Sequence, residues 1–454
     1  MSESRSSFTG KLGFVLAAAG SAVGLGNIWR FPYLAAQYGG AIFLFVYVAL
    51  AVTFGFTLLV AEIAIGRKTG LSAIGAFKKL DKRFSFVGWI AALVPMIILP
   101  YYSVIGGWVV KYFSGYVVGD GAKMASDGFF GGFISKTAEP LVWFGIFITL
   151  TAAVVILGVE KGIEKVSKVM MPVLVVVMLF IAIYTIATMD GSWDGVVYYL
   201  KPDFSKFSVM TVVAAMGQLF YSMSLAMGIM ITFGSYMKKD ISIEKSVHHI
   251  EIFDTGIAFL AGLMIIPAVF AFSAGGESEV ALSGPGLMFE TLPKVFNTMP
   301  GGSVIGALFF IMVFFAAITS SISLMETVVS IVCDKLGWKR LPASLAVFGV
   351  AFALGSVSAL GFSVWSGVKP LGLSDILTFF DFISNNIIMP VVALLTSLFI
   401  AYFLKPKTII EELEIGGGFK SKRLFCVMIK YVAPVFLVAI LVSSVLNALG
   451  VVTI

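Results

Sequence analysis

Long apolar runs alternate with short polar breaks along the whole chain of 454 residues. A helix needs about 20 apolar residues to cross the hydrocarbon core of a bilayer, and these runs reach that length. Glycine, proline and charged residues in the breaks set the predicted helix limits. The pattern predicts eleven transmembrane helices, at residues 12–36, 41–66, 85–116, 142–158, 164–188, 208–237, 246–273, 303–335, 341–363, 373–403 and 424–449. The predicted fold class is an all-α membrane protein in which residues 1–454 form one transmembrane domain.

Composition excludes several other classes of protein. Hydrophobic residues make up 59% and charged residues 12% of the chain, whereas a soluble domain carries about 25% charged residues. Neither a Gly-x-Ser-x-Gly elbow nor a His pair at metal-binding spacing occurs, so we do not expect an enzyme. The basic residues lie in short loops between helices, which argues against nucleic acid as a partner. Cys333 and Cys426 lie in or beside apolar helices and do not predict a disulfide framework.

The distribution of charge predicts the orientation in the membrane. An odd number of helices places the two termini on opposite sides. Most of the 31 lysines and arginines fall on one set of loops, with dense clusters at 67–83 and 405–430. The positive-inside rule then makes the N-terminus cytoplasmic and the C-terminus extracellular, in the inner (plasma) membrane. Two external connections are long, and the second, 274–302, reads equally well as a lid or as a passive loop.

Two of the predicted helices are interrupted in their middle. The first contains GSAVGLGNIWRFP at 20–32, with closely spaced glycines that weaken a helix, although they could equally form a packing face for another helix. The sixth contains GQLFYSMSLAMG at 217–228, where serines and Gly228 break an apolar run at a matching depth. Corresponding breaks in two halves predict a binding site at the membrane midplane. Unpaired amides there attract an anion and unpaired carbonyls a cation.

The first of these strings closely resembles the signature of the neurotransmitter:sodium symporters, as do LPYYSVIGGW at 99–108 and FFAAITSSISLME at 314–326. The resemblance runs from about Arg5 to residue 400. It implies the LeuT fold of two inverted five-helix repeats, here 12–188 and 208–403, with 424–449 as an extra helix and with helices 1 and 6 unwound at mid-membrane. Among bacterial members, the chain resembles the multi-hydrophobic amino acid transporter type.

The resemblance implies two Na+ sites built from oxygen ligands, which suit a hard cation. The first would use the Ala22 carbonyl, Asn27, Ser222 and Asp254, together with the carboxylate of the substrate. The second would use the carbonyls of Gly20, Val23 and Ala316 and the hydroxyls of Thr319 and Ser320. Hydroxyls in a membrane helix also commonly bond to carbonyls of their own helix.

Asp254 is an isolated acid in a membrane helix, and such residues are functional by default. Chloride-dependent relatives have a neutral residue at this position, so the carboxylate implies that chloride is not needed. A solvated Asp254 that faces the cytoplasm is the alternative.

Gly24 is the residue that indicates the class of substrate. Monoamine transporters of the family have an Asp there, whereas a Gly implies a substrate whose own carboxylate completes the first sodium site. The substrate-binding residues would be Ala22, Gly24, Leu25, Gly26, Tyr102, Tyr221, Ser222, Ser224, Met227, Ser321 and Leu324, with Val104 or a neighbour. The wall of this pocket has no charged partner, so apolar and aromatic L-amino acids are the expected substrates.

Further residues resemble the gates of the family. Arg30 and Asp381 match the external pair, and Arg5 with Asp334 matches an internal latch near Ser235 and Tyr236, with ordinary snorkelling as the alternative for the latch residues. Glu62 would bond amides of the unwound sixth helix. Gly162 and Pro172 match a segment of the fifth helix that unwinds, although both residue types are also normal at helix boundaries.

These features predict a Na+-coupled symporter that imports apolar and aromatic L-amino acids by alternating access. The expected partners are the small-molecule substrate and the lipid bilayer, and no obligatory protein partner is evident. A proton-coupled transporter of the same fold, with Asp254 or Glu62 as carrier, is the nearest alternative. An ion channel would require a symmetric pore repeat or a charged ring, and the sequence contains neither.

Overall fold

The structure is a computed structural model that describes residues 7–273 and 285–448. Within this part of the chain the only regular secondary structure is helical, and each of the eleven predicted ranges is occupied by helix. Nine helices there are long and apolar enough to cross a membrane: Ala41–Thr69, Lys82–Val117, Ala138–Ile156, Val159–Thr188, Ile243–Phe272, Gly302–Leu336, Arg340–Leu360, Ile376–Leu404 and Lys422–Leu446.

The first predicted helix is broken and bent. Helix α1 (Lys11–Ala22) ends where Val23 becomes extended, with φ −77° and ψ 101°. The chain resumes as a π-helical turn (Gly26–Arg30) that continues into α2 (Phe31–Gln37), and the two halves meet at 57°. Counted as one span, this pair raises the number of candidate spans in the described residues to ten.

The sixth predicted helix consists of two short helices. Helix α12 (Val209–Ser222) and α13 (Ile229–Ser235) are separated by residues 223–228. Ser224 (φ 52°) and Ala226 (φ 60°) in this break adopt left-handed conformations, as does Gly228 (φ 71°). Such a conformation costs on the order of 1–3 kcal/mol for a residue other than glycine, so the surrounding contacts must hold it. Neither α12 nor α13 is long enough to qualify as a membrane span by itself. Length and composition therefore leave the predicted total of eleven transmembrane helices untested.

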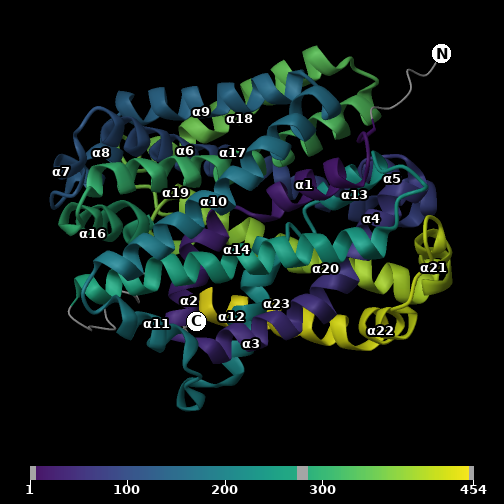
Figure 1. The fold of residues 1–454 in the computed structure, drawn as a ribbon. Helices are drawn as coiled ribbons and strands as arrows, with labels where there is room; N and C mark the ends of the chain where they lie inside the picture. The colour runs from purple at the N-terminus through teal and green to yellow at the C-terminus, as the bar shows by residue number, and fades with distance from the viewer. Residues whose placement is uncertain (1–6, 274–284, 449–454) are drawn as a thin grey trace.

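Short helices gather at the two ends of the bundle (Figure 1). One end carries α5 (Ala73–Leu80) and α21 (Pro406–Glu414), beside the start of α1. The opposite end carries α7 (Gly121–Met124), α8 (Phe129–Ile134), α11 (Ser192–Leu200) and α16 (Leu292–Thr298). Of the predicted lid, residues 274–284 lie outside the described part, and the remainder includes α16.

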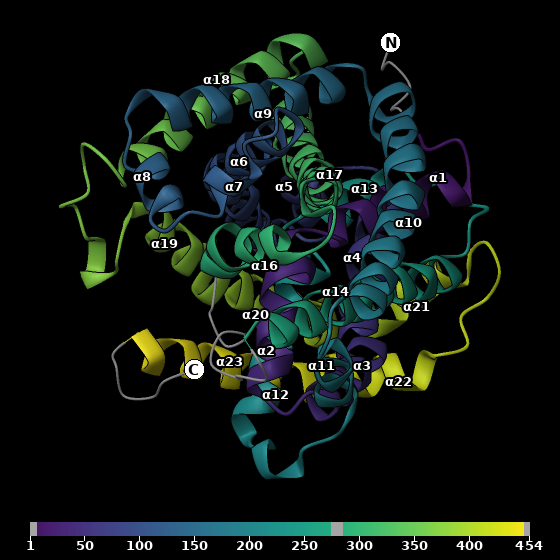
Figure 2. The ribbon, with the colours of Figure 1, turned by 60° about the vertical axis from the view of Figure 1, so that its left-hand side comes forward.

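Helix α17 (Gly302–Leu336) lies near the middle of the bundle and packs against α1, α6 (Ser85–Val117), α9 (Ala138–Ile156) and α10 (Lys165–Thr188) (Figure 2). Elsewhere, α4 (Phe56–Thr69) and α13 pack backbone against backbone. A Cβ on Gly66 would collide with the carbonyl of Ile231, and one on Gly234 would collide with the backbone of Ile63. Because no side chain separates them, α4 and α13 form a tightly coupled pair.

Candidate functional site

The two helix breaks lie against each other in the interior. The Ser224 hydroxyl donates to the Ser21 carbonyl at 3.0 Å and lies 3.1 Å from the Ser21 hydroxyl. The Gln218 side chain donates to the Gly26 carbonyl at 3.0 Å. All four residues are buried. Polar side chains of the sixth predicted helix therefore bond to main-chain carbonyls on either side of the break in the first.

The side chains predicted for the first sodium site form one buried cluster. Asp254, on α14 (Ile243–Phe272), is 0% exposed, so the alternative of a solvated Asp254 is wrong. Its carboxylate accepts hydrogen bonds from the Asn27 amide (2.8 Å), the Tyr47 hydroxyl (2.7 Å) and the Ser222 hydroxyl. The Asn27 oxygen in turn accepts the N–H of Gly24 at 3.1 Å. The sequence did not indicate Tyr47, because a tyrosine in an apolar run gives no sign that it faces a buried acid.

The residues predicted for the second sodium site meet where α1 ends. The Ser320 hydroxyl lies 3.3, 3.1 and 3.2 Å from the carbonyl oxygens of Gly20, Ser21 and Val23. The Ser21 carbonyl also accepts from Ser224, but the single hydroxyl proton of Ser320 cannot satisfy the carbonyls of Gly20 and Val23 together. The arrangement therefore suits a cation, which several oxygens can share.

Thr319 partly supports the alternative in which a hydroxyl in a membrane helix bonds to carbonyls of its own helix. Its hydroxyl donates back to the carbonyls of Phe315 (2.9 Å) and Ala316 (3.2 Å) in its own helix. Its Cβ nevertheless lies 3.2 Å from the position of a Cβ on Gly20, so the side chain contacts the end of α1. Thr319 and Ala316 thus lie one helical turn or less from the Ser320 cluster.

A small cavity of about 30 Å³ lies between the breaks, well below the roughly 150 Å³ of a protein cavity that holds benzene. It is lined by Ser21, Ala22, Gly24, Gly26, Asn27, Ile98, Tyr102, Tyr221, Ser224, Met227, Ile229, Ser320 and Leu324. Its head is polar and its far wall is apolar. The sequence missed Ile98 and Ile229, which carry no chemical signal apart from their positions.

Some predicted substrate contacts lie elsewhere. Leu25 does not line the cavity, and its N–H donates to the Tyr102 hydroxyl at 3.3 Å. Ser222 belongs to the Asp254 cluster. Ser321 is turned away and lies 3.1 Å from the Thr151 hydroxyl of α9. Its neighbour Ser320 faces the cavity with Leu324, one turn further along the helix.

Val104 is also absent from the lining of this cavity. Helix α6 contributes Ile98 and Tyr102 to the lining instead. Ile98 and Tyr102 are four residues apart and share one face of the helix. Val104 is only two residues beyond Tyr102 and so points to another side.

Glu62, on α4, contacts the break in the sixth helix. Its Oε1 accepts the N–H of Ala226 at 2.7 Å, and its Oε2 has no hydrogen-bond partner among the described residues. This hydrogen bond holds the main chain of the break at Ala226, which, like Ser224, has a left-handed conformation.

Replacing this acceptor should loosen the break. Glu62→Ala leaves the buried Ala226 N–H without a partner and should lower the free energy of unfolding by about 1–3 kcal/mol. Glu62→Gln keeps an oxygen acceptor and should retain most of the stability. Thermal unfolding followed by size-exclusion chromatography tests this comparison, and equal losses in both variants would contradict the role given to the hydrogen bond.

The predicted external gate residues make no direct ion pair in the described structure. Asp381 accepts hydrogen bonds from Tyr101 (3.0 Å) and Asn385 (2.6 Å). The Arg30 guanidinium lies 5.9 Å from the centre of the Tyr221 ring. Both Arg30 and Asp381 line a cavity of about 470 Å³ that Phe130 of α8 also borders. They are therefore neighbours across an opening and do not close it.

The predicted internal latch is only partly described. Arg5 lies outside the described residues, and Asp334 accepts the N–H of Ser72 at 2.7 Å. Tyr236 donates to Glu326 at 2.7 Å, and Glu326 forms an ion pair with Arg340 at the start of α18 (Arg340–Leu360). The sequence did not predict this cluster, which joins the end of α13 to α17 and α18.

The segment predicted to unwind is helical here. Gly162 lies in a π-helical turn (Val159–Glu164) that begins the fifth predicted helix, and Pro172 lies inside α10. Glu164 in this turn accepts the N–H of Thr9 at 2.9 Å and pairs with Lys168 at 2.6 Å. The widened turn and the proline both weaken helical hydrogen bonding locally, and the opening of this helix stays a prediction.

An all-helical membrane bundle with two opposed breaks around a buried, oxygen-rich centre is the architecture of a secondary transporter. The profile of the Sodium:neurotransmitter symporter family matches residues 5–119 and 134–451. The chain belongs to this family, and it is therefore a sodium-dependent, multi-pass membrane transporter and not an enzyme.

Individual relatives agree with this assignment. YhdH of Bacillus subtilis (strain 168), an uncharacterised sodium-dependent transporter, is 34% identical over 452 residues, covering 97% of both chains. An uncharacterised sodium-dependent transporter of Haemophilus influenzae is 30% identical over 456 residues, covering 97% of this chain and 98% of the relative. The crystal structure of MhsT in complex with L-phenylalanine matches with a TM-score of 0.86 and 34% identity, over 97% of this chain and 100% of that chain. The LeuT fold predicted from the sequence is confirmed.

Proposed function

We propose that this transporter imports apolar and aromatic L-amino acids together with Na+, without a need for chloride. The observation that carries the proposal is the cavity between the two breaks. Its head is formed by Gly24, Gly26 and Tyr102, and its far wall by Ile98, Met227 and Leu324. The Gly26 amide and the Tyr102 hydroxyl suit the α-carboxylate, while an apolar wall disfavours a charged side chain. The L-phenylalanine in the MhsT structure supports the same class of substrate.

In this proposal two sodium ions bind beside the substrate. Asp254, Asn27, Ser222 and the Ala22 carbonyl hold the first ion, with the substrate carboxylate as a further ligand. The second ion lies at the end of α1 near Ser320, with the ligands named above. Each ion that moves down a potential of 100 mV contributes about 2.3 kcal/mol, enough for roughly fifty-fold accumulation of substrate.

Transport would proceed by alternating access. The cavity of about 30 Å³ is too small for an aromatic side chain. Tyr221, Met227 and Leu324 must therefore move when such a substrate binds, and the flexible Met227 adapts most readily. The end of the bundle with α5 and α21 would face the cytoplasm, and the end with α7, α8 and α16 the outside. Separation of the Tyr236, Glu326 and Arg340 cluster would then open the inner side.

A proton-coupled transporter of the same fold is the second candidate, and it is favoured by buried Glu62, whose Oε2 has no hydrogen-bond partner in residues 7–273 and 285–448. Purified protein in proteoliposomes separates the two candidates. We expect uptake of labelled L-phenylalanine under an inward sodium gradient, unchanged when gluconate replaces chloride. Competition by each of the twenty amino acids should be strong for apolar and aromatic ones and absent for charged ones. Uptake driven by a proton gradient alone would overturn sodium coupling.

A further inference from the structure

The chain that follows the long helix Ile376–Leu404 folds back onto the end of α4. Helix α21 (Pro406–Glu414) lies beside α4 at the end of the bundle that carries α5 (Figure 1). We use the term strap for residues 406–421, which comprise α21 and the turn up to Ser421. Its inner face is apolar, with Ile409 and Leu413 buried. The strap is also held by an unusual set of polar contacts.

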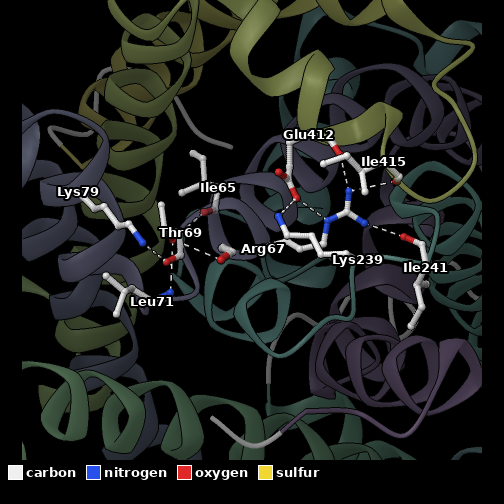
Figure 3. Close-up of polar contacts among 10 residues, drawn as sticks. Ile65, Arg67, Thr69, Leu71, Lys79, Lys239, Ile241, Glu412 and Ile415 are labelled. Atoms are coloured by element: carbon white, nitrogen blue, oxygen red, sulfur yellow. Dashed lines mark hydrogen bonds and ion pairs between the residues drawn. The ribbon is translucent and has the colours of Figure 1, made fainter. Parts of the chain in front are cut away.

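Arg67, near the end of α4, is the centre of these contacts, and its side chain is 0% exposed (Figure 3). Its Nε donates to the Glu412 carboxylate at 2.8 Å, and its Nη2 donates to the carbonyls of Glu412 and Ile415. Its Nη1 donates to the Ile241 carbonyl at 2.6 Å. Every nitrogen of the guanidinium is therefore engaged, two toward the strap and one toward the loop that joins α13 to α14.

Glu412 receives a second cation from the same loop. The Lys239 ammonium lies 2.6 Å from the Glu412 carboxylate that Arg67 also contacts (Figure 3). Arg67 and Glu412 are buried, whereas the Lys239 side chain is 53% exposed, so removing either member of the buried pair leaves an uncompensated charge. The strap, the end of α4 and the loop after α13 thus share a single ionic junction.

Further contacts follow the rest of the strap. Gly416 (φ +85°) lies so close to the carbonyls of Lys239 and Ile241 that a Cβ would come within 2.8 Å of both oxygens. Glu244, at the start of α14, accepts the N–H groups of Lys420 (2.9 Å) and Ser421 (3.0 Å). The strap is therefore joined to the segment 239–244 along its length.

The strap is connected to the preceding helix through a bend in the main chain at Lys405. That helix ends in a π-helical turn (Phe399–Leu404), and the next residue, Lys405, is exposed with φ 69°. A residue other than glycine in this conformation marks a place where the chain changes direction under constraint. Residues at the ends of elements absorb the backbone changes of hinge motions.

We infer that the strap moves with α4 and α13 during transport, that the chain bends at Lys405, and that Arg67 and Glu412 are the positioning residues that tie the strap in place. The backbone contact between α4 and α13 makes them one body, and the Arg67 junction adds the strap to it. Because the strap leads into α22 (Lys422–Val427), movement of α13 is passed on to the last long helix. This inference rests on the alternating access proposed above.

Distances between spin labels test the inference in the full-length protein. Labels are placed at Asp240→Cys, Phe403→Cys and Lys407→Cys, in pairs, with Cys333 and Cys426 replaced by serine. The protein is compared in sodium with L-phenylalanine and in sodium-free potassium chloride. We expect the distance between 240 and 407 to stay constant while that between 403 and 407 shifts. The opposite pattern, a constant 403–407 distance with a shift in 240–407, would overturn the inference.

If no distance shifts between the two conditions, the result counts against alternating access and not against the tie between the strap and α4. A second comparison, between variants, then tests the tie itself. Glu412→Gln should broaden the 240–407 distance distribution in either condition, and Glu412→Asp should partly restore it. Glu411→Gln alters the exposed neighbour on the same helix and should leave the distribution unchanged. Glu412→Gln should also lower the turnover number at an unchanged KM, because the substrate cavity is not touched. Equal widths for Glu412→Gln and Glu411→Gln would overturn the tie.

Discussion

Asp254→Asn should lower the affinity for sodium by at least about 10-fold, since the loss of even an outer-shell partner of a metal ligand costs roughly 10–100-fold. Asp254 supplies the only formal charge from the protein in the proposed first sodium site, and it is fully buried. Asparagine has nearly the same shape and can still accept from Tyr47, so the cluster should remain folded. The change therefore isolates the charge that attracts the cation.

Sodium titrations of L-phenylalanine binding to purified protein measure this effect. Glu251→Gln is a matched control, because it removes another buried carboxylate from α14, one turn before Asp254. The control should keep the sodium affinity of the wild type. A normal titration curve for Asp254→Asn, or an equal loss in Glu251→Gln, would show that Asp254 is not a ligand of the ion.

The helical framework could be predicted from the sequence because the bilayer imposes it locally. Each span must be a run of apolar residues, and every predicted range is helical in the described structure. The two breaks were also predictable. Glycines at 20–26 and serines at 222–224 are local features, and the chain leaves the helix at these points.

Contacts between distant residues could not be predicted in the same way. Arg67 and Glu412 are 345 residues apart, and nothing near either one in the sequence indicates the other. The pair of Glu326 and Arg340 was missed for a similar reason, since a turn separates two helices whose packing the sequence does not specify. Helical phase accounts for the absence of Val104 and Ser321 from the lining of the small cavity, because one or two residues along a helix move a side chain to another face.

Gly24→Ala should weaken L-phenylalanine binding by about 1–3 kcal/mol, the usual cost of overpacking, or roughly 5- to 150-fold. A Cβ at this position would lie 2.9 Å from the Ser320 hydroxyl and 3.0 Å from the Tyr102 hydroxyl. These two groups border the polar head of the cavity, where we place the carboxylate of the substrate. The φ of Gly24 is not in the left-handed region, so alanine adds a methyl group without backbone strain.

Gly256→Ala provides the control for this experiment, because a Cβ on Gly256 would meet nothing within 4 Å. It should bind L-phenylalanine as the wild type does, and both variants should unfold at similar temperatures. If Gly24→Ala binds normally, the carboxylate does not lie between Tyr102 and Ser320, and the amino acid must be held elsewhere. If Gly24→Ala fails to bind L-phenylalanine but accepts the smaller glycine or L-alanine, the added methyl group reduces the room in the cavity and leaves its polar head able to hold a carboxylate.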